Sequence, residues 1–219
     1  MIRAVFFDFG ETLFNEDGVW RAWAGWYGVP PLTFAGALGA VVERRAHHLE
    51  VFSYFDDDFS LDRVEAERAA AGAAFALSAD DLYADAAPCL AALRAEGYLV
   101  GVSGNQPPDV SERLLREAGI EVDVLASSAA WGVEKPDPAF FDRVVAEAGC
   151  AAGEVAYVGD RVDNDVLPAK AAGLVAVFLR RGPWGYVHAR WPEAAAADLR
   201  VGSLAALPEA LRGLREGAS

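Results

Sequence analysis

The feature that most constrains the fold is a regular alternation of short apolar runs and helix-like segments from Ala86 onward. Runs of four to six apolar residues have the length of buried strands rather than of helices. Alternation of this kind predicts a parallel sheet that is covered by helices on both faces. The strand-like runs occupy 4–7, 98–102, 122–125, 155–158 and 174–179, and the helix-like stretches between the later ones occupy 107–118, 138–148 and 163–172. Glycines stand where a helix should end before a strand, at Gly97, Gly119, Gly149 and Gly173.

Residues 15–85 break this alternation, because they hold helix-like segments and no convincing strand. The fold class that we expect is therefore α/β: a doubly wound, Rossmann-like parallel sheet core with an inserted α-helical cap. Residues 1–14 and 86–219 would form the core. An insertion directly after the first strand would sit over the strand ends and could act as a lid. The helices expected in it are 19–27, 32–51, 61–77 and 80–87, and the core would close with a short strand at 199–201 and a helix at 204–214.

Composition narrows the range of partners. The 219 residues are 53% hydrophobic, which is ample for a sizeable core, and carry a formal net charge of −14. Nucleic acids and anionic membranes require basic patches, so neither is an expected partner, whereas the oligomeric state stays open. No signal-peptide pattern and no apolar run of about 18 residues is found, so a transmembrane helix is not expected. Cys89 and Cys150 lack the spacing of a metal or disulfide pair. They suggest free thiols in the cytoplasm.

Acidic residues stand directly after two of the expected strands. Asp8 follows the run Ala4–Phe7, and Asp160 and Asp165 follow the run at 155–158. A carboxylate at the end of a parallel strand lies in the crevice where open α/β sheets bind ligands, which suits a nucleophile or a metal ligand. Two carboxylates in one loop are typical of a Mg²⁺ site. The alternative is structural: Asp8 would cap a turn, and Asp163 and Asp165 would cap the helix that they open. Asp160 fits that alternative poorly.

Groups that bind oxygen atoms follow other strands. Ser103, with Gly104 and Asn105 after it, places a hydroxyl and backbone N–H groups where phosphate oxygens can bind, although such triplets are often simple turns. Lys135 is followed by two prolines that stiffen its segment, so it suits a phosphate or carboxylate clamp; otherwise it is an exposed loop lysine. Arg180–Trp184 follows the last core strand and either borders the site or forms a surface turn.

The signals at Asp8, Ser103, Lys135 and Asp160, taken in sequence order, resemble those of the haloacid dehalogenase-like hydrolase superfamily. The segment Asp8–Leu13 looks like the first motif of that family, Asp-x-Asp-Gly-Thr-Leu. Ser103 matches the Ser/Thr of the second motif, and residues 132–138 match the third. The fourth motif, in its GDxxxxD form, is matched by Gly159–Asp165. The helical insertion between motifs one and two resembles the C1 cap of the family.

The resemblance implies roles for individual residues. Asp8 would be the nucleophile that forms an aspartyl-phosphate, with Ser103 and Lys135 as the other catalytic residues. Substrate would be bound by Ser103 and Lys135 together with Thr12, Gly104 and Asn105. The implied cofactor is Mg²⁺, held by Asp8, Asp160, Asp165 and the backbone carbonyl of Gly10.

The departure from the family pattern that matters for catalysis is at position 10. Gly10 stands where phosphatases of the family usually carry a second aspartate as general acid/base, a role worth about 10²–10⁴-fold in rate. Either Glu11, Glu16 or a cap residue replaces it, or the leaving group needs little protonation.

Three functions are compatible with this pattern. The first is a Mg²⁺-dependent hydrolase acting on a small phosphorylated metabolite, which would be its small-molecule partner. The second is a 2-haloacid dehalogenase-type carbon–halogen hydrolase, whose leaving halide needs no proton but whose mechanism leaves Asp160 and Asp165 unexplained. The third is a catalytically weak binding protein with the same fold. Dependence on a metal ion distinguishes the first from the second.

Overall fold

The computed structural model describes residues 1–73 and 77–216, which form two compact units. The first unit joins Met1–Asn15 to the chain from Leu82 onward, and the second is Glu16–Asp81. The second unit is thus an insertion in the first, which the chain leaves after Asn15 and re-enters at Leu82. At these connections Phe14 and Leu82 pair as an antiparallel bridge.

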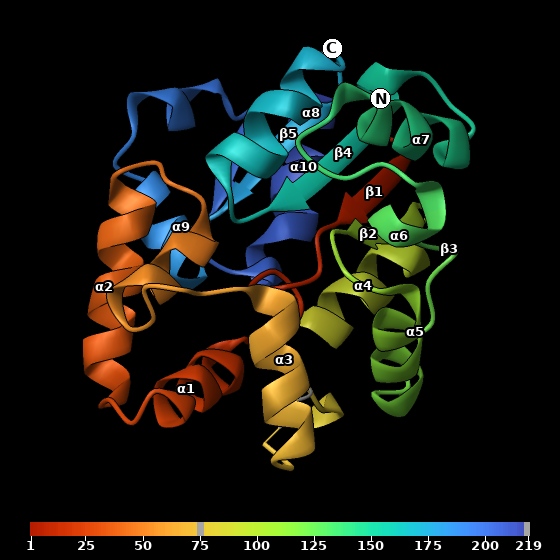
Figure 1. Cartoon of the computed structure of the whole chain (residues 1–219). Helices are drawn as coiled ribbons and strands as arrows, with labels where there is room; N and C mark the ends of the chain where they lie inside the picture. Colours follow the sequence, from red (N-terminus) through yellow and green to blue (C-terminus); the bar gives the residue numbers. More distant parts are fainter. Residues whose placement is uncertain (74–76, 217–219) are drawn as a thin grey trace. The chain divides into compact units, whose positions relative to one another are not determined.

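The first unit is built on a parallel sheet of six strands within the described residues, in the order β3-β2-β1-β4-β5-β6. This confirms the predicted α/β class. The chain winds outward from β1 to β3, returns to place β4 on the other side of β1, and then winds outward again (Figure 1). The winding direction therefore reverses between β1 and β4, which is the topological switch point of the sheet. The strands are Ala4–Phe7 (β1), Leu99–Gly104 (β2), Val124–Ser127 (β3), Val155–Gly159 (β4), Val175–Leu179 (β5) and Leu199–Val201 (β6).

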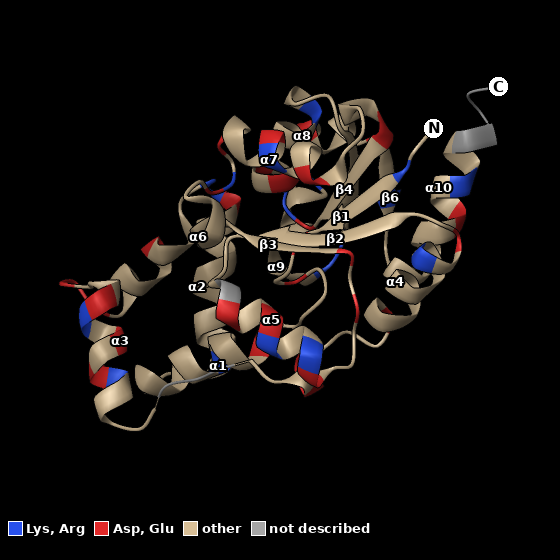
Figure 2. Cartoon of the chain, turned by 90° about the vertical axis from the view of Figure 1, so that its right-hand side faces the viewer, with Lys and Arg blue, Asp and Glu red and all other residues tan. Residues whose placement is uncertain are grey.

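Helices cover both faces of this sheet. Figure 2 views the sheet nearly along its edge, with α7 and α8 on one face and α4, α5 and α10 on the other. The α-helices of this unit are α4 (Ala86–Ala95), α5 (Pro108–Glu117), α6 (Ser128–Trp131), α7 (Pro138–Ala148), α8 (Leu167–Ala171), α9 (Gly182–His188) and α10 (Leu207–Glu216). Shorter helical turns are η3 (Ala152–Glu154), η4 (Val162–Val166), η5 (Pro192–Ala196) and η6 (Leu204–Ala206).

A buried apolar cluster joins the α7/α8 layer to the sheet. Ala4 and Phe6 from β1 pack with Phe140 and Phe141 from α7 and with Tyr157 from β4. The rings meet edge to face: Phe141 lies 5.1 Å from Tyr157 between ring centroids. Burial of each such aromatic side chain contributes about 1.5–3 kcal/mol. The core thereby fixes the central strands, and with them the positions of the residues that follow those strands.

The second unit is helical and is held together by aromatic side chains. Phe52 lies at its centre, with its ring centroid 4.5 Å from that of Trp23 and 5.9 Å from that of Phe34. The guanidinium of Arg68 covers the Trp23 ring at 3.9 Å. The helical elements of the second unit are α1 (Asp17–Trp26), α2 (Pro31–Glu43), η1 (His48–Tyr54), α3 (Leu61–Ala70) and η2 (Ala79–Asp81).

Several predicted boundaries were wrong. The expected helix 32–51 is two elements, because α2 ends at Glu43 and Arg45 has a left-handed φ of 61°. The expected helix 80–87 is the turn η2 followed by α4, and residues 74–76 of the expected helix 61–77 lie outside the described residues. Strand β3 starts at Val124, two residues late, because Asp123 turns its carboxylate to the N–H of Val100 at 2.8 Å.

Other expectations on local structure were correct. All four glycines predicted to end helices have positive φ, and Pro138 occupies the first turn of α7. Among the described residues, no helix has the length and apolar character needed to cross a membrane.

Candidate active site

Asp8 and Asp160 lie side by side at the switch point of the sheet. β1 and β4 pair in register, Phe7 opposite Val158, so the residues after them leave the sheet at the same edge. The N–H of Asp8 donates to the carbonyl of Val158 at 2.8 Å, which extends the ladder by one residue and fixes the Asp8 backbone. Both side chains are buried. The sequence-based expectation that these residues share one crevice agrees with this geometry.

Asp165 reaches the same place from a π-helical turn. In η4 the N–H of Val166 donates to the carbonyl of Arg161, five residues back, and π-helical turns of this kind are frequent at functional sites. The Asp165 carboxylate accepts from the N–H of Arg161 at 2.9 Å. A Cβ added at Gly159 would overlap this carboxylate, so glycine is required there. Asp8, Asp160 and Asp165 each offer an oxygen within 4.8 Å of the others.

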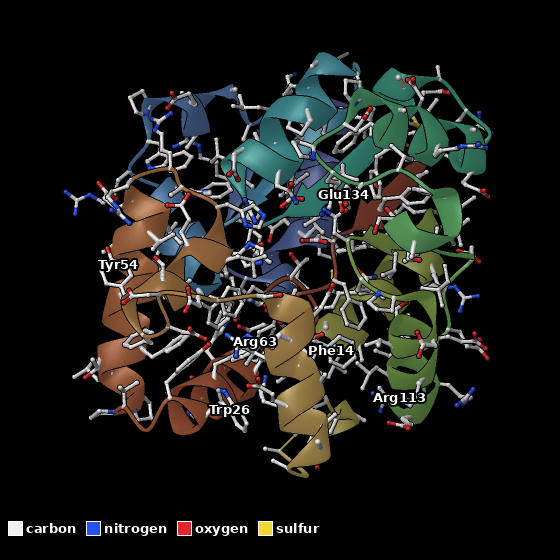
Figure 3. The ribbon with its side chains drawn as sticks, viewed as in Figure 1. Phe14, Trp26, Tyr54, Arg63, Arg113 and Glu134 are labelled. Carbon is white, nitrogen blue, oxygen red and sulfur yellow. The ribbon has the colours of Figure 1, made fainter. Side chains whose placement is uncertain are left out.

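Lys135 lies between two of these carboxylates. Its Nζ is 2.7 Å from Asp8 Oδ1 and 2.6 Å from Asp165 Oδ1, and its side chain is 1% exposed. The alternative reading of Lys135 as an exposed loop residue was therefore wrong. Asn105 holds the backbone of Lys135 from both sides: its Nδ2 donates to the carbonyl at 2.8 Å, and its Oδ1 accepts from the N–H at 2.9 Å. Glu134, labelled in Figure 3, precedes Lys135 in the segment that follows α6.

The charges of this cluster do not balance. Three carboxylates face one ammonium, which leaves a formal charge of −2 in a buried environment. Burial, and then repulsion from Asp165 and Asp8, raises the pKa of Asp160 well above its ordinary value. Burial would lower the pKa of Lys135, but the carboxylates of Asp165 and Asp8 outweigh it and raise that pKa. Asp160 Oδ2 is buried and has no hydrogen-bond partner among the described residues.

These donors fit a hard divalent cation. A buried carboxylate oxygen without a partner is costly unless a positive charge or a hydrogen-bond donor meets it. Carboxylate oxygens are the ligands that Mg²⁺ prefers, and a charge of +2 would neutralise the cluster. Asp8, Asp160 and Asp165 are therefore the residues that could hold a metal ion.

Two buried hydroxyl groups lie in segments that border the carboxylates. Ser103 is the next-to-last residue of β2, and Thr12 lies four residues after Asp8. The side-chain oxygen of each is buried without a partner among the described residues. The carbonyl of Ser103 accepts from the phenol of Tyr157 at 2.7 Å, which fixes its backbone. A Cβ at Gly104 would come within 2.6 Å of Asp8 Oδ1, so the chain after Ser103 passes directly beside the carboxylate.

The loop after Asp8 has an unusual backbone at Glu11. This residue has a φ of 52°, in the left-handed region that costs non-glycine residues about 1–2 kcal/mol. The family motif has glycine at this position, the residue for which a left-handed φ carries no steric cost, whereas this chain places a glutamate there. Here the Glu11 carboxylate is buried and accepts from the phenol of Tyr83 at 2.6 Å. Gly182 leaves the space for it, since a Cβ there would lie 2.6 Å from Glu11 Oε2.

The loop that carries Asp160 and Asp165 has its own supports. His188 on α9 accepts from the N–H of Val162 through Nδ1 at 3.0 Å and stacks on Trp191. Arg161 pairs with Asp163 at 2.9 Å and covers the ring of Trp184. Asp163 therefore faces an arginine and does not join the carboxylate cluster.

Several supporting residues were not identified from the sequence. Tyr83, Tyr157 and His188 lie outside the four motifs, and their contacts join segments up to 72 residues apart. Arg181 lies in a segment that the sequence did point to, but its partners could not be inferred. Position was the available signal for three of them: Tyr157 lies in β4, Arg181 lies shortly after β5, and Tyr83 lies at a connection to the inserted segment. His188 lies in α9 and had no such signal.

The fold and the site together define a class of protein: an α/β protein with a doubly wound parallel sheet and a buried carboxylate centre at the switch point of that sheet. The chain belongs to the haloacid dehalogenase-like hydrolase family, which its residues 2–173 match. The family resemblance read from the four motifs is thereby confirmed.

Individual relatives agree with this assignment. The chain is 37% identical over 125 residues to the phosphoserine phosphatase of Thermus thermophilus, covering 56% of this chain and 48% of that protein. It is 37% identical over 105 residues to the glyceraldehyde 3-phosphate phosphatase of Methanopyrus kandleri, covering 47% and 45%. The matches thus span about half the length of these relatives. The L-2-haloacid dehalogenase of Xanthobacter autotrophicus has the same fold, with a TM-score of 0.70 and 24% identity over 97% of this chain and 99% of that one.

Proposed function

We propose that the protein is a Mg²⁺-dependent phosphatase that hydrolyses the phosphomonoester of a small metabolite. The observation that carries the proposal is the buried trio Asp8, Asp160 and Asp165 with a formal surplus of negative charge and an unpartnered Asp160 oxygen. A site of this kind is suited to a divalent cation and, through it, to a second anion such as a phosphate. The phosphatases among the relatives agree with this chemistry.

In the proposed reaction, Asp8 is the nucleophile. One of its carboxylate oxygens forms a bond to phosphorus while the bond from phosphorus to the ester oxygen breaks, giving an aspartyl-phosphate and an alkoxide that takes up a proton. Water then attacks phosphorus, releasing inorganic phosphate and restoring the Asp8 carboxylate. Lys135, 2.7 Å from Asp8 Oδ1, would orient the nucleophile and bind phosphate oxygens together with the Ser103 and Thr12 hydroxyls and the N–H groups near Gly104 and Asn105.

The metal ion would be held by Asp8, Asp160, Asp165 and the carbonyl of Gly10. Bound there, Mg²⁺ would draw the two anions together and stabilise the charge on the transferring phosphoryl group. A carbonyl ligand needs no particular side chain, so a glycine at position 10 is compatible with metal binding. Glycine cannot protonate a leaving group, however, and we therefore expect the enzyme to prefer esters of acidic alcohols.

We further propose that the helical unit Glu16–Asp81 serves as the cap that selects the substrate. Two features support this role: the unit is inserted directly after the loop that carries the nucleophile, and it is compact by itself. Both cysteines are free, which suits a protein of the cytoplasm.

The second candidate is carbon–halogen hydrolysis, and Gly10 is the observation that favours it. A halide leaves without a proton, so the missing acid would cost nothing. The unpartnered oxygen of Asp160 argues against it, because a dehalogenase that works without a metal ion has no use for a buried, uncompensated carboxylate.

One assay separates the candidates. A panel of phosphorylated metabolites, aryl phosphates and 2-haloacids is incubated with the protein, with Mg²⁺ or with EDTA. We expect phosphate release that requires Mg²⁺ and disappears in Asp8→Asn, and unaltered release in Asp163→Asn, whose carboxylate lies in the same region but pairs with Arg161. Halide release that is indifferent to EDTA would overturn the proposal, and turnover by Asp8→Asn would exclude the covalent mechanism.

A further inference from the structure

We propose that Arg181 is a positioning residue for the loop Asp8–Thr12, so that a side chain just beyond the carboxyl end of β5 fixes the backbone that carries the nucleophile. The inference rests on the proposed function for the identity of the site, but its first measurement requires neither metal nor substrate. From the sequence alone, the segment Arg180–Trp184 either borders the site or forms a surface turn.

The contact itself joins two distant parts of the chain. Arg181 Nη1 donates to the backbone carbonyl of Thr12 at 2.9 Å, across 169 residues of sequence. Arg181 is the second residue after β5, and its side chain is 11% exposed. A largely buried guanidinium that donates to a carbonyl fixes both the position and the direction of that peptide group.

Arg181 is itself anchored on its other side. Its Nη2 donates to the carboxylate of Asp85, and the same Oδ2 accepts from the hydroxyl of Ser203 at 2.8 Å and from the N–H of Leu204 at 2.9 Å. Burial alone would raise the pKa of Asp85, but the hydrogen bonds from Arg181 and Ser203 outweigh it and lower that pKa. The carboxylate therefore stays charged and holds the guanidinium in place.

The guanidinium of Arg181 also packs against Tyr83, which makes a second contact to the loop. Arg181 Cζ lies 4.1 Å from the centre of the Tyr83 ring, and the phenol of Tyr83 donates to the Glu11 carboxylate at 2.6 Å. The next residue, Gly182, accommodates that carboxylate. Two successive loop residues are thus held: Thr12 by Arg181 itself, and Glu11 by Tyr83, whose ring lies against Arg181.

This arrangement matters for the site because of where the held residues lie. Asp8 is fixed by the strand ladder at one end of the loop, and Glu11 and Thr12 are held at the other. Gly10 lies between them. Glycine has the greatest backbone freedom of any residue, so its carbonyl direction depends on the residues that flank it. Holding Glu11, which is in a left-handed conformation, is therefore a way to orient the Gly10 carbonyl toward a metal ion.

The experiment compares Arg181→Met with Arg180→Met. Arg180 is the neighbouring arginine, and its guanidinium covers the exposed ring of Tyr186, so it is a matched control outside the site. Hydrogen–deuterium exchange of the peptide that contains residues 8–14 is measured without metal. Mg²⁺ binding is then measured by calorimetry without substrate, and kcat and KM are measured on the best substrate of the panel.

We expect Arg181→Met to increase exchange in this peptide at least fivefold, to weaken Mg²⁺ binding about tenfold and to lower kcat with little change in KM. Arg180→Met should match the wild type in all three. Arg181→Lys should not restore function, because one ammonium cannot hold Thr12 and Asp85 in the fork geometry of a guanidinium.

Two results would overturn the inference: unchanged exchange in residues 8–14, or faster exchange with unchanged Mg²⁺ affinity and kcat, which would mean a purely structural contact. Should Arg181→Met fail to fold, Tyr83→Phe keeps the ring beside Arg181 and removes only the donor to Glu11, and the same readouts apply with a smaller expected change. A wild-type protein that neither binds Mg²⁺ nor hydrolyses phosphate esters would overturn the proposed function, whereas unchanged loop exchange in Arg181→Met overturns only this inference.

Discussion

The ammonium of Lys135 lies 2.6 Å from the carboxylate of Asp165, and both side chains are almost completely removed from solvent. Such a pair is costly to bury, and it persists because each partner meets an opposite charge and further hydrogen bonds. Lys135 also reaches Asp8, whereas the described part of the chain gives Asp160 Oδ2 no donor. This asymmetry, two carboxylates with a lysine and one without, is the reason to expect a cation at the remaining side.

Replacement of Lys135 should lower the stability of the protein far more than replacement of Lys170, the other lysine of the chain. Lys135→Met leaves Asp8 and Asp165 buried without their cation, so we expect the free energy of unfolding in EDTA to fall by about 3–5 kcal/mol. Lys170→Met removes a half-exposed ion pair with Asp198 and should cost about 0–1 kcal/mol. Urea denaturation of both variants measures the difference. Similar decreases in the free energy of unfolding of the two variants would show that the buried Lys135 ion pairs stabilise the protein no more than an exposed pair does.

A methyl group at Gly159 should disturb the metal site without touching a charge. Its Cβ would overlap the Asp165 carboxylate, so Gly159→Ala must displace Asp165 from Lys135, at a cost of about 1–3 kcal/mol. We expect Mg²⁺ binding, measured by calorimetry, to weaken at least tenfold. Gly153→Ala is the matched control, because a Cβ there meets no atom within 4 Å. Wild-type affinity in Gly159→Ala would mean that Asp165 does not contribute to the metal site.

Restoration of the missing acid should change the selectivity for leaving groups. In Gly10→Asp we expect kcat on alkyl phosphates to rise by up to about 10²-fold, and kcat on aryl phosphates to change little, because aryl oxides leave without protonation. The ratio of the two rates, measured at saturating Mg²⁺, is the quantity to compare. An equal change on both substrates would show that proton donation is not what position 10 limits.

Stability should depend on pH and Mg²⁺ together. Burial, and then repulsion from Asp165 and Asp8, raises the pKa of Asp160, so the folded state binds this proton more tightly than the unfolded state. The contribution is therefore fully present below the unfolded pKa of about 3.9 and is lost as pH rises through the folded pKa. We expect Mg²⁺ to raise Tm strongly at about pH 8 and only weakly at about pH 5.

Thermal unfolding in EDTA and in Mg²⁺ at both pH values measures this effect. Asp160→Asn has no proton to exchange at this position, so its metal-free Tm should fall less than that of the wild type between the two pH values. An equal gain from Mg²⁺ at both pH values would contradict the assignment of Asp160 as the uncompensated carboxylate.

The local pattern of the sequence was sufficient for the fold class and for the carboxylates. Apolar runs such as Ala4–Phe7 and 155–158 report burial on both faces of a strand, and burial of this kind is a property of each segment by itself. Parallel strands place their carboxyl ends at one edge, so Asp8 and Asp160 could be paired without coordinates. Boundaries were less predictable: Asp123 delays β3, and Arg45 breaks an apolar helical stretch, through side-chain and backbone choices that periodicity does not report.

Only the tertiary structure decided which polar groups have a hydrogen-bond or ion-pair partner and which do not. Three contacts show this. Asn105 bonds the backbone of Lys135, Tyr83 bonds Glu11, and Arg181 bonds Thr12, and in each case the partners are between 30 and 169 residues apart in the sequence. A hydrogen-bond partner is defined by position to within a few tenths of an ångström, and the sequence restricts positions only through the complete packing of the core. The surplus of negative charge at Asp160 likewise depends on the tertiary structure, because it is the sum of the charges that the fold places around this residue.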